Sequence, residues 1–305
     1  MFLGLPEAAE SEGFDRETLD MPAKQIALLE AVATENKNVV VVLSNGSVVT
    51  VAPWAKNAKG ILESWLLGQS GGPALADVLF GKVSPSGKLA QTIPFDINDD
   101  PSTINWPGEE GHVDYGEGVF VGYRYYDTYN KAVDYPFGFG LSYATFEVSD
   151  VKAVKTGACT ATVSAVVKNT SNVDAAETVQ VYVAPGKADV ARPKHELKGF
   201  KKVFLKAGES AEISLDLDDR PSPTGPRSST IGMSRAANTP SRSARPAVTS
   251  PVPRWWSSTA TARPSRSPNG PTSWNGVRIR SVPRCLKSCV PRAKPAACRW
   301  CPTTT

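Results

Sequence analysis

Every acidic residue of this chain of 305 residues lies before residue 220. Residues 221–305 hold 14 of the 34 basic residues and 14 of the 25 prolines, so this tail carries a charge of +14 and the preceding part −10. The tail also has few of the aliphatic side chains whose burial offsets the conformational entropy lost on folding. The sequence therefore predicts a folded part over residues 1–220 and a disordered basic tail over residues 221–305.

The first part of the chain alternates between strand, glycine-turn and helix patterns. Val39–Leu43 is an unbroken run of valine and leucine, which is typical of a parallel strand buried on both faces. Ile61–Trp65 predicts a second short strand, and the turn Gly68–Gly72 leads into a helix predicted over Ala74–Phe80. This order predicts an α/β sandwich domain with a mostly parallel sheet over residues 1–105.

The start of this domain has a strand pattern with no neighbour before it. Met1–Leu5 is largely apolar, and a parallel strand of this kind normally lies between two others. We therefore expect the α/β domain to be truncated at its N-terminal side. Apolar residues at helical spacing predict an amphipathic helix over residues 22–35, with Asp20 as its cap.

Residues 106–145 are rich in acidic and aromatic residues and predict a linker. From residue 146 to residue 220 the pattern changes to short strands of alternating polarity, separated by turn residues. The predicted strands are Ala161–Lys168, Glu177–Ala184 and Ala211–Leu217. This pattern predicts an antiparallel β-sandwich that is incomplete at its end.

A group of charged residues follows the first strand pattern and precedes the first helix. Glu10, Glu12, Asp15 and Arg16 lie within seven residues of this loop. In α/β sheets, ligands bind at the loops that follow the carboxyl ends of strands. Most runs of charge are solvated surfaces, so the spacing alone leaves a surface loop and a functional site both open. The polar turn Ser44–Ser47, after the valine-rich strand, is expected to lie beside this loop.

The loop reads Glu10-Ser11-Glu12-Gly13-Phe14-Asp15-Arg16, followed by Leu19-Asp20-Met21-Pro22 and Gln25. This order resembles the second domain of glycoside hydrolase family 3, the β-glucosidase-like enzymes. The resemblance continues through Pro85–Leu89, Val121–Asp127 and Tyr135–Tyr143. Glu196–Lys202 resembles the fibronectin type III-like domain that ends many of these enzymes, so residues 146–220 are expected to be structural.

The resemblance implies retaining hydrolysis of terminal β-linked sugars, with Glu12 as the general acid/base. An acid of this kind needs a pKa raised by burial or by a neighbouring carboxylate. Glu10 is the candidate for that neighbouring charge, or for exchanging roles with Glu12. Asp15 and Arg16 are candidates for contacting substrate or for orienting the loop, and a local ion pair that orients the loop is the preferred interpretation.

The partner carboxylate is missing from the sequence. The resemblance implies that the nucleophile is an aspartate on a preceding (β/α)8 barrel, and no segment of this chain corresponds to it. The chain is therefore expected to be a fragment of a β-glucosidase-like enzyme that is inactive without the barrel. A non-catalytic carbohydrate-binding or scaffold protein is the alternative from another class.

The tail has two explanations. If the codons from Arg220 onward are read two bases out of register, their degenerate positions permit residues resembling those that usually follow in the family, so a frameshift near residue 220 accounts for the tail. Alternatively, the tail binds nucleic acid through its arginines and tryptophans, with loosely zinc-like pairs of cysteines. These are Cys285, Cys289, Cys298 and Cys301. The frameshift explains the cysteines and the charge together, so we favour it over nucleic-acid binding.

The folded part has little with which to bind a metal or a cofactor. Its one cysteine, Cys159, has no partner for an internal disulfide, and His112 and His195 lie far apart in sequence. No apolar run approaches the length of a membrane span. We therefore expect no metal, no cofactor and no membrane association, and a cytoplasmic location.

Overall fold

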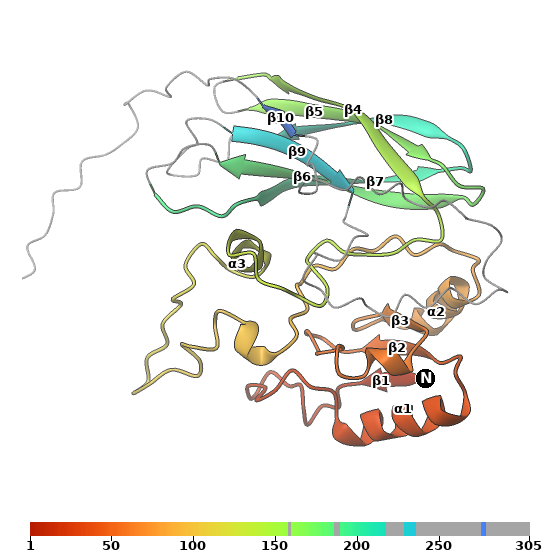
Figure 1. Ribbon diagram of the computed structural model, residues 1–305, viewed down its shortest axis with the longest axis vertical. Coiled ribbons are helices and arrows are strands. Elements are labelled where there is room, and N and C mark those ends of the chain that lie inside the picture. The colour runs from red at the N-terminus through yellow and green to blue at the C-terminus, as the bar shows by residue number, and fades with distance from the viewer. Residues whose placement is uncertain (158–159, 186–189, 218–228, 236–275, 279–305) are drawn as a thin grey trace, which may run out of the picture.

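The computed structural model describes residues 1–157, 160–185 and 190–217, and describes the backbone of residues 229–235 and 276–278. An α/β domain lies at one end and a β-sandwich at the other, with a long connecting segment between them (Figure 1). The fold class predicted for residues 1–220 is therefore confirmed.

The α/β domain is built on a three-stranded parallel sheet in the order β1-β2-β3. These strands are β1 (Phe2–Gly4), β2 (Val40–Ser44) and β3 (Gly60–Glu63). The central strand is the predicted valine-rich run, and Val41, Val42 and Leu43 are at most 2% exposed. Strong burial on both faces explains why this strand has no alternation of polarity.

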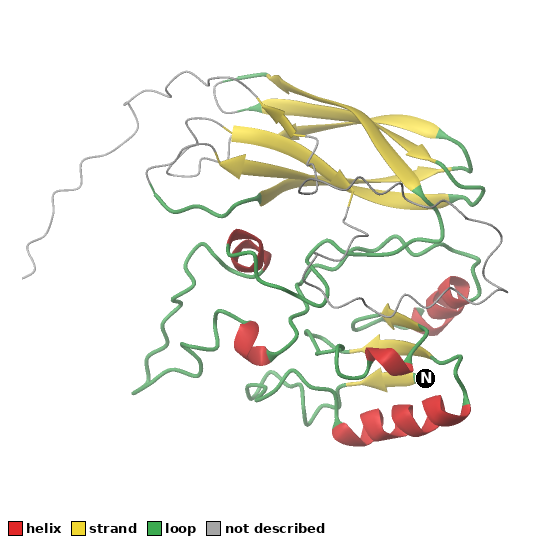
Figure 2. Cartoon of the chain, viewed as in Figure 1, coloured by secondary structure: helices red, strands yellow, loops and turns green. Residues whose placement is uncertain are grey.

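Helix α1 (Ala23–Glu35) runs alongside β1 (Figure 2). Its Leu29 is fully buried and belongs to the same apolar core as Leu43 and Trp54. Trp54 immediately precedes the short helix η1 (Ala55–Asn57). Burial of these side chains gives the domain its own core despite the small sheet.

Helix α2 (Gly71–Leu79) begins three residues earlier than predicted, because the last part of the glycine turn is already helical. Conversely, β3 ends at Glu63, two residues before the predicted end. The cause is local, since Trp65 has a φ of 52° and leaves the extended conformation. The strand therefore ends beside the loops that follow β1 and β2.

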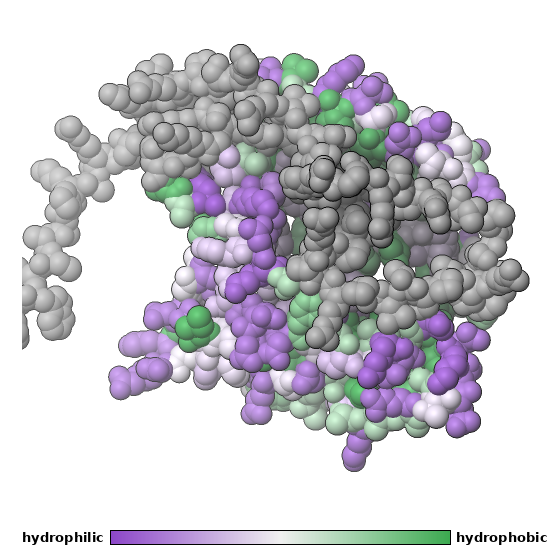
Figure 3. Space-filling model, in the orientation of Figure 1, coloured by the Kyte–Doolittle hydropathy of each residue, from purple (hydrophilic) through white to green (hydrophobic). Residues whose placement is uncertain are grey.

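The predicted linker contains structure of its own. It carries helix α3 (Tyr123–Thr128), and the short helix η2 (Ile97–Asp99) precedes it. Its end returns to the α/β domain, where Tyr135 packs against the first core and forms a bridge with Ile93. The face seen in Figure 3 is mainly hydrophilic over this region, with single hydrophobic side chains among polar ones.

The second domain is an antiparallel β-sandwich, as predicted. One sheet has the order β4-β5-β8 and the other the order β10-β9-β6-β7. Its strands before the tail are β4 (Phe146–Lys155), β5 (Ala161–Asn169), β6 (Ala175–Pro185), β7 (Glu196–Leu205) and β8 (Ser210–Leu217). Strands β4 and β7 were not predicted, because exposed charged residues interrupt the apolar alternation along both.

The prediction of disorder over residues 221–305 is wrong at two places, where the structure has strands. Strand β9 (Ser229–Arg235) pairs with β6, and β10 (Gly276–Arg278) pairs with β9. The unpaired backbone groups along the edge of β6 accept any extended segment, since ladder hydrogen bonds need no particular side chains. The rest of the tail, Cys159 and the four tail cysteines lie outside the described residues.

Polar contacts join the sandwich to the α/β domain and to the connecting segment, and the first of them is buried. Lys88 forms an ion pair with Glu177 of β6 at 2.9 Å and donates to the carbonyl of Gly140 at 3.1 Å. His195, just before β7, pairs with Asp127 of α3 at 2.5 Å. Among the described residues, no cluster of metal-ligating side chains occurs, and none of the described helices is long and apolar enough to cross a membrane.

Candidate active site

The candidate site lies where the three parallel strands end. The loop after β1 carries the charged residues Glu10 to Arg16, and the turn Asn45–Val48 follows β2. Hydrogen bonds connect this loop to the turn, so the sequence expectation that they lie together is confirmed. As in other α/β sheets, the ends of the strands thus gather polar groups from separate segments.

Glu10 anchors the charged loop to the turn after β2. Its carboxylate accepts hydrogen bonds from the backbone N–H of Gly46 at 2.7 Å and from Ser47 Oγ at 2.8 Å. Burial by itself would raise the pKa of Glu10, but these hydrogen bonds and the nearby Arg16 charge outweigh it and lower the pKa. Glu10 is therefore held as an anion and suits an anchoring role better than that of an acid.

Arg16 reaches the same turn from the other end of the loop. Its Nη1 donates to Ser47 Oγ and to the carbonyl oxygen of Val48, each at 2.8 Å. Burial lowers the pKa of Arg16, and the Glu10 charge opposes that shift. Ser47 is thus shared by both charged residues, which fixes the two ends of the loop against β2.

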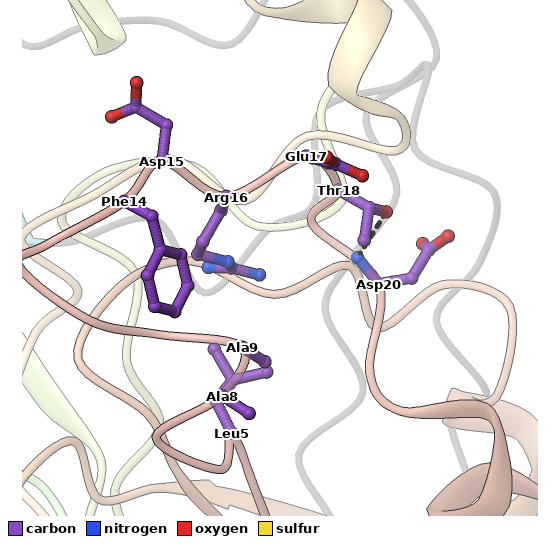
Figure 4. A pocket seen from close by; sticks show the side chains of 9 residues that line it. All are labelled: Leu5, Ala8, Ala9, Phe14, Asp15, Arg16, Glu17, Thr18 and Asp20. Carbon is purple, nitrogen blue, oxygen red and sulfur yellow. Dashed lines mark hydrogen bonds between the residues drawn. The ribbon is translucent and has the colours of Figure 1, made fainter.

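The prediction that Asp15 and Arg16 form an ion pair is wrong. Asp15 is exposed and points away from the guanidinium of Arg16 (Figure 4). Neighbouring side chains in an extended loop diverge, and Arg16 instead donates to two oxygen acceptors in the turn after β2. Asp15 therefore does not orient Arg16.

A cavity of about 360 Å³ lies under this loop. Figure 4 shows Leu5, Ala8 and Ala9 on one side of it, with the ring of Phe14 and the side chain of Arg16 opposite. Its remaining lining residues are Asp15, Glu17, Thr18 and Asp20. The cavity is small and mixed in polarity, as expected of one part of a site for a polar ligand.

Glu12 lies outside this cavity, at the exposed tip of the loop. The tip is a tight turn in which Ser11 and Phe14 form a bridge and the Gly13 N–H donates to Ser11 Oγ at 3.3 Å. The carboxyl group of Glu12 therefore projects from a loop whose base is fixed by Glu10 and Arg16. Such an arrangement presents Glu12 to whatever binds this face.

Sequence reasoning missed Glu63 at the end of β3. Asn45, which is fully buried, donates from Nδ2 to the Ser47 carbonyl at 2.9 Å and to Glu63 Oε2 at 3.3 Å. Burial raises the pKa of Glu63, and the hydrogen bonds from Trp65 and Asn45 oppose the shift. Its position at a strand end was the available signal. Glu63 supports the turn that holds the charged loop.

Gln25 fixes the end of β1 from helix α1. Its side-chain amide donates to the Gly4 carbonyl at 2.7 Å and accepts from the Gly4 N–H at 3.0 Å. This paired contact replaces the strand hydrogen bonds that Gly4 would otherwise make on that side. The charged loop thus starts from a fixed point.

Comparison with known proteins identifies the family of these domains. Residues 1–143 match the Glycosyl hydrolase family 3 C-terminal domain, and residues 177–222 match the Fibronectin type III-like domain. The first match includes residues 106–143 of the segment treated above as a linker. Through these two domains, the chain belongs to glycoside hydrolase family 3.

Its relatives are glycosidases. The chain is 84% identical over 220 residues to the exo-α-(1→6)-L-arabinopyranosidase of Bifidobacterium longum, a match that covers 72% of this chain and 29% of the relative. It is 50% identical over 223 residues to the thermostable β-glucosidase B of Acetivibrio thermocellus, covering 72% of this chain and 29% of that enzyme. The chain therefore spans less than a third of the length of these relatives.

A solved structure agrees with these matches. The crystal structure of the Bifidobacterium adolescentis family 3 β-glucosidase superposes with a TM-score of 0.74 and 76% sequence identity. The superposition covers 78% of this chain and 37% of the solved chain. The described domains thus have the fold of the C-terminal region of such enzymes.

Proposed function

We propose that residues 1–217 form the C-terminal part of a retaining glycoside hydrolase in which Glu12 is the general acid/base. The observation that carries the proposal is the construction of the loop. Glu10 and Arg16 attach both ends of it to Ser47, while Glu12 projects from its tip. A carboxyl group held out on a fixed loop is suited to reach a substrate bound by a second domain.

Retention requires two carboxyl groups about 5–5.5 Å apart across the scissile bond. In the proposed reaction, Glu12 protonates the leaving oxygen while the other carboxylate attacks the anomeric carbon. Glu12 then removes a proton from the water that releases the sugar from that carboxylate. The second carboxylate is the aspartate that the family resemblance assigns to a preceding barrel.

The exposure of Glu12 has a consequence for this mechanism. A general acid keeps its proton near neutral pH only where burial or a like charge raises its pKa. Glu10 is an unsuitable source of that charge, because its carboxylate is turned toward Gly46 and Ser47. We infer that a barrel covering the loop tip supplies the burial. The chain by itself therefore should not hydrolyse glycosides.

The substrate class is a glycoside with a terminal sugar in the pyranose form. One relative is named for α-L-arabinopyranosides and another for β-glucosides. Both kinds of glycoside carry an equatorial bond at the anomeric carbon, so one arrangement of two carboxyl groups serves either. The described residues supply the acid, and the sugar specificity is expected to come mainly from the barrel.

A chimera tests the proposal. Residues 1–220 would replace the matching segment of the Bifidobacterium longum enzyme, to which they are 84% identical. We expect the chimera to be active and Glu12→Gln to lower its rate about 10²- to 10⁴-fold on glycosides with poor leaving groups. The loss should be much smaller on an aryl glycoside whose leaving group needs no proton.

Glu7→Gln is the matched control, because Glu7 is an exposed carboxylate of the same loop. It should leave the rate on both kinds of substrate within a few-fold of the unsubstituted chimera. Equal losses in Glu12→Gln on good and poor leaving groups would remove Glu12 from the role of acid.

A further inference from the structure

A second cavity, of about 570 Å³, lies next to the candidate active site. It is lined by Leu19 of the loop before α1, by the turn after β2, by residues within 90–94 and 100–102, and by the connecting segment around α3. Its volume falls within the range of about 300–1,000 Å³ that is typical of small-molecule sites. It is thus large enough for a ligand the size of a sugar ring.

The two cavities share a wall. Ser47 and Val48 line the second cavity, and both accept hydrogen bonds from Arg16, which lines the first. Leu19 lines the second cavity and Asp20 the first. A ligand in the second cavity would therefore lie one side chain away from the loop that carries Glu12.

Three aromatic side chains line part of the second cavity. Tyr123 and Phe137 stack on each other with ring centroids 4.5 Å apart, and Tyr126, which is buried, also lines the cavity. The Tyr123 hydroxyl accepts a hydrogen bond from the Leu197 N–H of the sandwich at 2.7 Å. These contacts hold the rings rigidly, and rigid aromatic surfaces suit the C–H faces of a sugar ring.

Two polar residues, Thr92 and Asp100, also line the second cavity. Asp100 Oδ1 accepts from the backbone N–H of Ser102 at 2.9 Å and from its hydroxyl at 2.5 Å. Within the part of the chain that the structure describes, its Oδ2 has one hydrogen bond, a long one of 3.4 Å from the Tyr126 hydroxyl. The hydroxyl of Thr92 has no hydrogen-bond partner within the described part of the chain. The Oδ2 atom of Asp100 is thus available to a ligand, whereas the Thr92 hydroxyl is buried and reaches the cavity only after its side chain rotates.

From this combination we infer that the second cavity binds a sugar ring, separately from the site of Glu12. Hydroxyl groups of the sugar donate to Asp100 Oδ2 and to the Thr92 side chain, after a rotation of Thr92 about its Cα–Cβ bond. The apolar face of the ring packs on Tyr123 and Phe137. The carboxylate favours neutral, hydroxyl-rich ligands over anionic ones.

The test is a binding titration of the complete chain with D-glucose and L-arabinose, followed by saturation-transfer NMR. We expect saturable binding in the millimolar range, as is usual for a small polar ligand. Two tryptophan substitutions at exposed alanines identify the cavity, because Ala90 lines the second cavity and Ala8 the first. Ala90→Trp should weaken binding at least tenfold, and Ala8→Trp should leave it unchanged.

A second pair of variants tests the chemistry without filling space. Asp100→Asn removes the charge that accepts the sugar hydroxyl and should weaken binding about tenfold. Asp99→Asn, the neighbouring carboxylate, does not line the cavity and should have no effect. Far-UV circular dichroism checks that each variant remains folded.

Two results would overturn the inference. One is the absence of saturable binding up to about 0.1 M sugar. The other is binding that is lost in Ala8→Trp and retained in Ala90→Trp, which would place the sugar in the first cavity and leave the proposed role of Glu12 intact. Because Glu12 lines neither cavity, failure of this inference is distinguishable from failure of the catalytic proposal.

Discussion

The ion pair between Lys88 and Glu177 is expected to be the strongest single polar determinant of how the two domains hold together. The two side chains are only 6% and 2% exposed, and their charged atoms are 2.9 Å apart. Lys88 also donates to the Gly140 carbonyl, and Glu177 Oε1 accepts from the Thr178 N–H at 3.0 Å. Loss of either partner would leave the other charge buried with one neutral contact.

The magnitude follows from these distances. At 2.9 Å and an effective dielectric constant of about 20, the attraction is about 6 kcal/mol. The desolvation of the two ions costs several kcal/mol each, so the pair as a whole contributes little net stability. Removing one partner is different, because it keeps the desolvation cost and loses the attraction. Glu177→Gln or Lys88→Met should therefore lower the free energy of unfolding by about 3–5 kcal/mol.

Urea denaturation followed by circular dichroism measures this change. The double variant Lys88→Met, Glu177→Leu should be more stable than either single variant, because it buries no unpaired charge. Lys82→Met is the control, since Lys82 and Asp77 form an exposed pair with side chains 74% and 38% accessible. It should cost at most about 1 kcal/mol. Equal, small losses in Glu177→Gln and Lys82→Met would contradict the buried pair.

Three further changes follow from other contacts. Burial raises the pKa of Asp134 from 3.8 to about 6. Protonation of Asp134 therefore stabilises the folded state fully below about pH 4, and this stabilisation is lost as the pH rises through 6. Asp134→Asn should raise the melting temperature at about pH 7 and not at about pH 4; equal shifts would refute this linkage. Gly138 has a φ of +81°, and a Cβ added there would lie 2.5 Å from Gln180 Oε1. Gly81 has a similar φ of +75° but open space around it. In urea denaturation, Gly138→Ala should therefore lower the free energy of unfolding more than Gly81→Ala does. Glu10→Gln should speed amide hydrogen exchange in its loop, because it weakens the hydrogen bonds to the turn after β2; unchanged exchange would show that Glu10 is no anchor.

Burial that is uniform along a segment could be predicted from the sequence. The run Val39–Leu43 has no polar residue because both faces of β2 are covered, so its identity as a central strand followed from composition alone. The edge strands were harder. In strand β7, Lys201, Lys202 and Phe204 are all exposed, so the sequence shows no regular alternation of polar and apolar residues there. Edge strands escape prediction when their solvent side is chemically mixed.

The candidate site was predictable only in part. The charged loop and the polar turn after β2 were found because strand ends collect polar residues. The partners of Arg16 were not, because Ser47 and Val48 lie about thirty residues away and only the parallel pairing of β1 and β2 brings them near. Glu63 was missed for the same reason, since its contact with Asn45 depends on the pairing of β2 and β3.

The central claim, that Glu12 is the acid/base, is tested most directly by azide rescue of a Glu12→Gly variant of the chimera. With the carboxyl group removed, the glycosyl-enzyme formed from an aryl glycoside should persist, because no base remains to activate water. Azide needs no such base. It attacks the anomeric carbon, the enzyme carboxylate leaves, and a glycosyl azide forms with the configuration of the substrate. We expect azide to raise the turnover rate of Glu12→Gly and not that of Glu7→Gly, with this azide as the product. If azide neither speeds turnover nor enters the product, Glu12 is not the acid/base.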